Sequence, residues 1–136
     1  MEVQDILKKA IDLGACTQVN KATDWKSLCW LFFSPQGREF CRTNNYPTLE
    51  VFRGLKRKIE EFNLFVEEDT KLTNKDAAII SGTAELTYHG TERAYKVILM
   101  HGANVTIRIG NYAVVQVENI SGNYKVENDG TGRILV

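Results

Sequence analysis

The sequence has few of the residues on which metal sites and disulfide frameworks depend. Its only cysteines, Cys16, Cys29 and Cys41, lie far apart along the chain and form no CxxC pair. Structural zinc usually takes four ligands at short spacings, so we expect no metal and no cofactor. Three cysteines also cannot all pair, so we interpret them as free, mostly buried thiols of a cytoplasmic protein.

Long apolar segments and an excess of one charge are also missing. The most apolar run, LCWLFF at residues 28–33, is far shorter than the roughly 18 residues of a membrane span. The N-terminal MEVQDILKKAIDLG mixes acids and lysines, which is not the pattern of a secretory signal. Lysine plus arginine and aspartate plus glutamate number 17 each, which excludes the strong positive field of a non-specific nucleic-acid binder.

Common catalytic motifs are absent as well. The sequence contains no GxGxxG, P-loop, GxSxG or HExxH. The two histidines, His89 and His101, each precede a glycine, and we interpret both as turn residues placed at different corners of the fold. Neither a metal-binding histidine pair nor a Cys–His dyad is expected, and we predict a protein that is not an enzyme.

The segment 1–65 predicts a small helical subdomain with four helices. Apolar residues recur there at helical spacing, and capping residues or Pro precede the expected helix starts. The first expected helix covers residues 3–11 and is stopped by Gly14, and the second covers residues 24–33 with Thr23 or Asp24 as its N-cap. The third runs from Ser34-Pro35 to Cys41, and the fourth runs from Pro47 to residue 62.

The last of these helices carries a basic cluster of Arg53, Lys56, Arg57 and Lys58. Helix, turn and helix followed by such a cluster is compatible with a DNA-binding regulator whose cations contact phosphates. The alternative is a solvated outer face, which we favour because the first turn, LEVF at residues 49–52, offers few base-reading side chains.

Beyond a polar segment at residues 66–76, interpreted as a linker, residues 77–136 repeat. SGTAELTYHG from Ser81, HGANVTIRIG from His101 and SGNYKVENDG from Ser121 each have glycine at the second and tenth positions. A constant interval of this kind is the signature of stacked repeats. The segment predicts a β-solenoid with 20-residue coils, in which equivalent strands stack in parallel and glycines form the corners.

The columns of such a solenoid should be chemically alike. Val97 would lie over Val117 with Ala77 before them, and Val114 would lie over Ile134. Against this, inward residues would alternate in one phase over residues 84–88 and in the other over 105–109, which requires a bulge or a corner shift. An antiparallel meander or barrel is the alternative, but it gives no reason for a constant period.

The run ANVTIRIGNYAVVQVENISGNYKVENDG resembles the short Ala/Val/Gly/Asn-rich β-helix segments of bacterial and bacteriophage proteins. The resemblance covers residues 77–136 and concerns architecture only. Together with the helical segment 1–65, the repeat predicts an α+β protein in which a helical subdomain precedes a short β-solenoid. The resemblance implies a bacterial or phage mobile element as the context.

Three further expectations concern sites. The apolar strand RILV closes the sequence, so we expect a homodimer or homotrimer whose interface includes Ile134, Leu135 and Val136. A small-ligand pocket at the junction of helices and solenoid would be lined by Trp25, Trp30 and Phe33.

Several acids and arginines could share one face of the solenoid. We interpret this face as a mixed-charge solvated surface, with a carbohydrate-type activity as the alternative. Its residues are Glu85, Glu118, Glu127, Asp129, Arg93, Arg108 and Arg133.

Together these patterns favour a non-enzymatic binding or assembly protein that presents a rigid solenoid surface to copies of itself and to another protein. A DNA-binding regulator and a small-ligand-binding protein are the alternatives. No membrane partner is expected.

Overall fold

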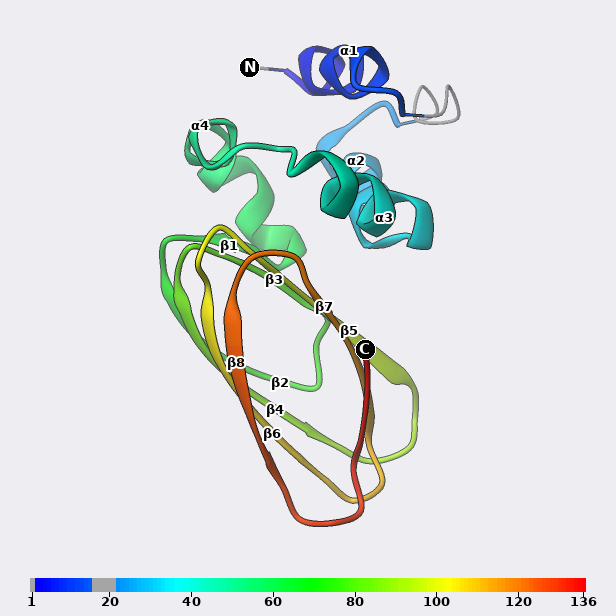
Figure 1. The fold of residues 1–136 in the computed structure, drawn as a ribbon, viewed down its shortest axis with the longest axis vertical. Helices are drawn as coiled ribbons and strands as arrows, with labels where there is room; N and C mark the ends of the chain where they lie inside the picture. Colours follow the sequence, from blue (N-terminus) through cyan, green and yellow to red (C-terminus); the bar gives the residue numbers. More distant parts are fainter. Residues whose placement is uncertain (1, 16–21) are drawn as a thin grey trace. The chain divides into compact units, whose positions relative to one another are not determined.

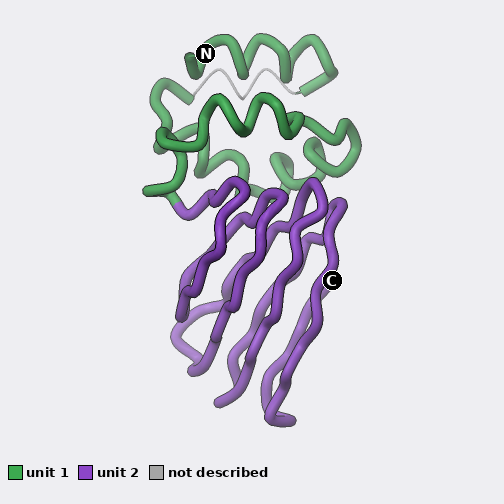
Figure 2. The backbone as a smooth tube through the Cα atoms, turned by 90° about the vertical axis from the view of Figure 1, so that its left-hand side faces the viewer, with its two compact units in different colours: residues 1–62 green, residues 63–136 purple. Residues whose placement is uncertain are grey.

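The computed structural model describes residues 2–15 and 22–136. It divides the chain into two compact units, residues 1–62 and 63–136 (Figure 2). The first unit is helical and the second consists of parallel strands, so the α+β class is confirmed. No helix in the described part of the chain is both long and apolar enough to cross a membrane.

The described part of the first unit contains four α-helices, as predicted. Asp24, Ser34 and Thr48 each accept a hydrogen bond from the backbone N–H three residues later, at 2.8, 3.1 and 3.2 Å, which fixes three of the helix starts. The last helix therefore begins after Thr48 rather than at Pro47. The helices are α1 (Val3–Asp12), α2 (Trp25–Phe33), α3 (Pro35–Asn44) and α4 (Leu49–Ile59), followed by the 3-10 turn η2 (Glu60–Phe62).

The second unit is a β-solenoid of about three turns, here called coils (Figure 1). Every strand pairing is parallel, which confirms the solenoid and excludes the meander. One sheet, sheet A, has the order β1-β3-β5-β7-β9, and the other, sheet B, has the order β2-β4-β6-β8. Sheet A contains β1 (Leu64–Val66), β3 (Ala77–Ile80), β5 (Ala94–Met100), β7 (Val114–Asn119) and β9 (Arg133–Leu135), and sheet B contains β2 (Asp69–Thr73), β4 (Thr83–His89), β6 (Asn104–Gly110) and β8 (Asn123–Asn128).

The 20-residue period holds between β3, β5 and β7 of sheet A. Ala77 pairs with Val97, and Val97 pairs with Val117, as the sequence predicts. The predicted pairing of Val114 with Ile134 is wrong by one residue. Val114 pairs with Arg133, and Ile134 pairs with Val115.

Sheet B departs from the 20-residue period, and the corners account for the departure. Ala84 pairs with Val105, one residue beyond the period, and Val105 pairs with Tyr124, one residue short of it. The corner after β3 has two residues, Ser81 and Gly82, whereas the corner after β5 has a third, Ala103, which is fully buried. The additional corner residue brings Ala84, Leu86 and Tyr88 into register with Val105, Ile107 and Ile109, so that both sets face the core and no bulge is needed.

The expected linker at residues 66–76 is part of the solenoid. β1 and β2 pair with β3 and β4 at an offset well below the 20-residue period, for example Leu64 with Ala78 and Asp69 with Thr83. The first coil is therefore shorter than the others, which is why the 20-residue pattern did not extend to it.

The solenoid core lies between the two sheets. Inward side chains form columns along the stack, such as Leu86–Ile107–Val126 on sheet B. Leu86 and Ile107 are fully buried, whereas Val126 in the last coil is 36% exposed. All four residues of β3 are buried, but the outer face of sheet B is polar, and this difference between the sheets positions the candidate site.

The corner glycines are needed for two different physical reasons. Gly102 has φ +83°, a conformation that residues with a side chain rarely adopt. Gly82 has an ordinary φ, but a Cβ there would lie 2.5 Å from the carbonyl oxygen of Glu68 in the neighbouring coil. Gly102 is therefore required by its backbone conformation, and Gly82 is required by the close approach of the neighbouring coil.

Two columns that are apolar elsewhere end in asparagine in the last coil. Leu99 is followed by Asn119, and Ile109 is followed by Asn128. The Asn119 amide accepts from the N–H of Gly122 at 2.8 Å and donates to its carbonyl at 3.0 Å, and Asn128 bonds the corner around Gly132 in the same manner. The last coil thus keeps a narrower apolar core than the coils before it.

Candidate binding surface

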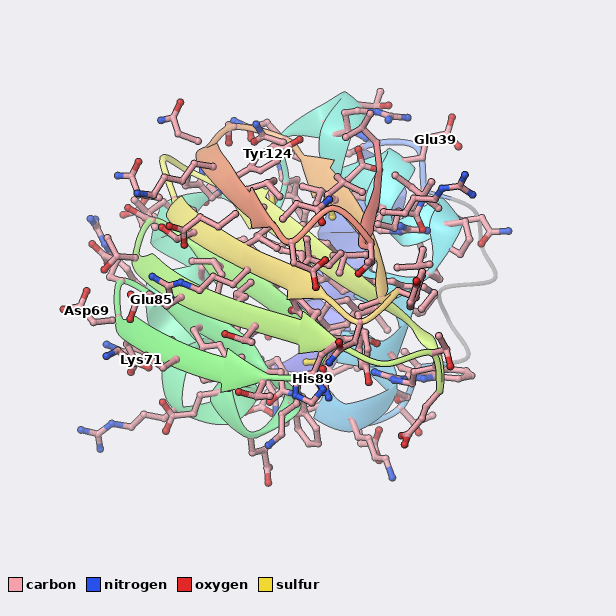
Figure 3. The ribbon with its side chains drawn as sticks, turned by 90° about the horizontal axis from the view of Figure 1, so that it is seen from below. Glu39, Asp69, Lys71, Glu85, His89 and Tyr124 are labelled. Carbon is pink, nitrogen blue, oxygen red and sulfur yellow. The ribbon has the colours of Figure 1, made fainter. Side chains whose placement is uncertain are left out.

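The outward side chains of sheet B form a surface here called the polar face (Figure 3). Because the strands are in parallel register, side chains of successive coils lie in rows across the sheet. Asp69, Thr83, Asn104 and Asn123 form one row, Lys71, Glu85, Thr106 and Lys125 form the next, and Thr73, Thr87, Arg108 and Glu127 form a third.

A chain of ion pairs crosses the polar face over four strands. Lys71 Nζ lies 3.2 Å from Glu85 Oε2, and Arg108 Nη1 lies 3.4 Å from Glu85 Oε1. Arg108 Nε lies 2.7 Å from Glu127 Oε2 on β8. Figure 3 shows Lys71 and Glu85 on neighbouring strands, on the same side of the sheet. Alternating charge therefore links β2, β4, β6 and β8, and each of these side chains is held by a neighbour.

The electrostatics of Glu85 follow from this chain. A hydrogen bond from Lys71 and the attraction of its charge, followed by a hydrogen bond from Arg108, lower the pKa of the Glu85 carboxyl below its ordinary value of 4.5. Glu85 is therefore a carboxylate at neutral pH and cannot serve there as a proton donor.

An open groove of about 800 Å³ lies on the polar face at the end where the strands of sheet B begin. It offers hydroxyls, amides and charges of both signs. The Thr83 hydroxyl donates to the Asp69 carboxylate at one side of the groove. Its outward lining residues come from all four strands of sheet B: Asp69, Lys71, Thr83, Glu85, Asn104, Thr106, Asn123 and Lys125.

A smaller hollow of about 450 Å³ lies where the same strands end, near His89, Arg108 and Asp129. Asp129 belongs to the corner after β8, where its carboxylate accepts from the Thr131 hydroxyl at 2.6 Å and from the Thr131 N–H at 2.8 Å. These hydrogen bonds lower the pKa of Asp129. Its carboxylate organises the corner, and we assign it no ligand.

The predicted mixed-charge face is only partly assembled. Glu85, Arg108 and Glu127 come together on sheet B, as described above. Glu118 and Arg133 lie on sheet A instead, and Arg93 pairs with Asp76 at 3.0 Å in the corner region. The sequence did not show where the chain turns from one sheet to the other, so it grouped residues of different sheets.

The basic cluster is spread around α4. Arg53 and Arg57 are exposed and one turn apart, whereas Lys56 is half-buried. Lys58 lies 3.8 Å from a Glu2 oxygen and 5.0 Å from the centre of the Trp25 ring, so it also contacts its own helical unit. The cluster thus does not present four equivalent cations to one phosphate backbone, and DNA binding stays a prediction.

The residues predicted for a ligand pocket point in different directions. Trp25 packs beside the buried Val3 and Leu7, whereas Trp30 is 82% exposed. The Phe33 ring stacks edge-to-face with Phe32, with 5.8 Å between ring centroids. The hypothesis of a pocket at the helix–solenoid junction stays a prediction.

The predicted oligomer residues also differ in orientation. Ile134 faces the core and is half-buried, while Leu135, paired with Gln116, faces outward and is 44% exposed. Val136 is 94% exposed. An interface through this segment stays a prediction.

The two described cysteines are buried, as expected. Burial raises the pKa of the Cys29 thiol to about 12, so it is an unreactive thiol at neutral pH. Cys41 is also buried, and Cys16 lies outside the described residues. His89 is the last residue of β4 in sheet B, whereas His101 follows β5 of sheet A, so the two histidines lie at different corners. Within residues 2–15 and 22–136, no group of three or more His, Cys, Asp or Glu side chains could hold a metal ion.

One buried charge was missed by the sequence analysis. Arg38 on α3 is 5% exposed, and its Nε and Nη1 atoms make no hydrogen bond within the described residues. An arginine in a short polar helix usually faces solvent, so no pattern in the sequence marked this residue.

Comparison of the chain with protein-family models, with curated proteins and with solved structures gives no match.

Proposed function

We propose that the chain is a binding protein without enzymatic activity, and that the polar face of sheet B is the surface with which it contacts a partner protein. The observation that carries the proposal is the groove of about 800 Å³ lined by side chains of all four strands of sheet B. The resemblance to short bacterial and phage β-helix segments supports a bacterial or phage origin, and the buried thiols support action in the cytoplasm.

The order of the polar face supports binding. The chain of ion pairs from Lys71 to Glu127 restrains long, exposed side chains by pairing them with their neighbours. Exposed ion pairs contribute little to folding stability. They reduce the conformational entropy that the same side chains would lose on binding, which favours association.

The shape and chemistry of the groove favour a protein as the partner. Small-molecule sites are concave and enclose most of the ligand, whereas this groove is open, and Thr106, Asn104 and charges of both signs lie along it. With strands about 4.8 Å apart, the four strands extend over about 14 Å of surface. A polar protein segment with interspersed charges can lie along such a surface.

The carboxylates of the polar face argue against hydrolysis of a glycoside. That reaction needs one carboxyl with a raised pKa beside a second, ionised one. Glu85 has a lowered pKa, and Glu127 is paired with Arg108 at 2.7 Å. Both carboxylates are therefore suited to ion pairing.

The proposal is tested by placing a photo-crosslinking amino acid at Thr106, in the middle of the groove. The matched control carries it at Gln116, which faces outward on the other sheet. After exposure in lysate, we expect covalent adducts from position 106 that position 116 does not give. The same adducts should disappear when Asn104→Arg is added to the Thr106 variant, because this change fills the groove.

Equal adducts from both positions, or no adduct from position 106, would refute the polar face as the binding surface. Circular dichroism of each variant shows whether the solenoid is intact. This control separates loss of binding from loss of fold.

A further inference from the structure

β8 is the last strand of sheet B, and one of its edges has no partner strand within residues 22–136. The N–H groups of Asn123 and Asp129 donate toward β6, to Ala103 and Ile109 at 2.8 and 3.1 Å. Successive residues of a strand point their backbone groups to opposite edges. The N–H and C=O groups of Tyr124, Val126 and Asn128 therefore face the open edge.

The charges of β8 are complementary to those of a second, antiparallel copy. Its sequence, NYKVEN, has a lysine before Val126 and a glutamate after it. When Val126 lies opposite Val126 of the second copy, each Lys125 lies opposite the other copy's Glu127. Opposite charges at directly facing positions stabilise an antiparallel pair.

Backbone hydrogen bonding selects the same register. Val126 faces the open edge with both backbone groups, so two copies would form a hydrogen-bonded pair there. Tyr124 would form a second such pair with Asn128 of the other copy. A slip of two residues in either direction keeps the hydrogen bonding but sets Lys125 opposite Lys125 or Glu127 opposite Glu127, which is destabilising.

Packing at the inner side agrees with this register. Val126 is 36% exposed at the end of the column that contains Leu86 and Ile107. A second Val126 would cover it, while Lys125 and Glu127 would remain at the polar rim. An apolar centre with a polar rim is the usual anatomy of a protein interface.

We propose that two copies of the chain associate through antiparallel pairing of β8 with β8, about a two-fold axis at Val126. The occupant of the open edge is a second copy, because the strand is complementary to itself in charge and in hydrogen bonding. The pairing makes sheet B continuous across the dimer and extends its polar face. It is independent of the partner protein proposed above.

The test measures the mass of the full chain by sedimentation equilibrium over a range of concentrations. We expect a dimer for the unchanged chain. Lys125→Glu and Glu127→Lys should each weaken the dimer at least about tenfold, because each variant places like charges opposite one another. Lys125 forms no ion pair within the described residues, so its reversal leaves the fold intact.

The decisive sample is an equimolar mixture of the two variants. Opposite charges face each other again in a mixed pair, so we expect a heterodimer, resolved by native mass spectrometry. Lys75→Glu, which changes an exposed lysine away from β8, is the matched control and should dimerise as the unchanged chain does.

A monomeric unchanged chain at the highest concentration would overturn the proposal. A dimer insensitive to Lys125→Glu, or a mixture without heterodimer, would overturn the register. Because only purified chain is used, these outcomes are separate from the crosslinking result for a partner protein.

Discussion

Replacing Ile107 by alanine should destabilise the solenoid more than a matched truncation one coil further along. Ile107 is fully buried, with Leu86 before it and Val126 after it in the same column. The coil is closed around this position by both sheets, so the neighbouring side chains have little freedom to fill the space that the substitution leaves.

The magnitude follows from the atoms that are lost. The carbon atoms removed from Ile107, at about 0.8 kcal/mol each, give about 2.4 kcal/mol of lost transfer free energy. A residual cavity adds to this, so we expect a total cost of about 3–5 kcal/mol. Val126→Ala removes fewer carbons from a side chain that is 36% exposed, so we expect about 1 kcal/mol.

The assay is urea denaturation followed by two probes, at a concentration where the chain is monomeric. The two tryptophans, Trp25 and Trp30, both belong to the helical unit, so their fluorescence reports that unit. Circular dichroism in the β-sheet region reports the solenoid. We expect Ile107→Ala to lower the midpoint of the circular dichroism transition, and the fluorescence transition shows whether the helical unit unfolds with it.

Equal costs for Ile107→Ala and Val126→Ala would refute this reasoning. That result would mean that the last coil is as well packed as the middle one, or that the middle coil collapses around the truncated side chain. Ile107→Val, expected to cost about 0.5–1.5 kcal/mol, is the conservative control.

Three further outcomes are expected. Lys71→Met should raise the pKa of Glu85, which NMR titration of its carboxyl measures. In the folded chain this pKa is lowered below its ordinary value of 4.5. The stabilisation that this carboxylate contributes is therefore present above pH 4.5 and is lost as the pH falls through the folded pKa. An unchanged pKa would contradict the contact. Gly90→Asn should cost about 1 kcal/mol, because the φ of +92° strains an asparagine although a Cβ there would have no atom within 4 Å. Gly82→Asn should cost more, about 3 kcal/mol, because its Cβ would clash with the backbone of Glu68. Equal thermal stabilities would contradict the distinction. Arg38→Met should raise the free energy of unfolding by about 1–3 kcal/mol, since it removes a buried guanidinium with unbonded nitrogens, and a lower urea midpoint would contradict this.

The architecture could be predicted from the sequence because the corner glycines and the stacked apolar residues both repeat every 20 residues. Ala77, Val97 and Val117 fall in line because β3, β5 and β7 keep a constant 20-residue offset. The prediction was wrong for Ile134, because a shorter third coil moved that strand by one residue. Small differences in corner length leave no trace in composition.

The first coil was missed for a related reason. β2 turns Asp69, Lys71 and Thr73 toward solvent and only Thr70 and Leu72 inward, so its composition resembles that of a polar linker. Its shorter offset, which pairs Asp69 with Thr83, also hides it from the 20-residue pattern.

The polar face could be predicted only in part. Glu85, Arg108 and Glu127 were grouped correctly from the sequence. The partner of Glu85 on the other side, Lys71, lies in the short first coil and was assigned to the linker. The groove depends on that coil, so no argument from the 20-residue period could have found it.

The asparagines of the last coil constrain how this solenoid can change in length. A coil added after β8 would bury the amides of Asn119 and Asn128, which now bond the corners at the end of the stack. A duplicate of residues 97–116 would instead enter between two apolar layers. Lengthening the solenoid by an internal duplication should therefore disturb fewer polar contacts than stacking a coil on β8.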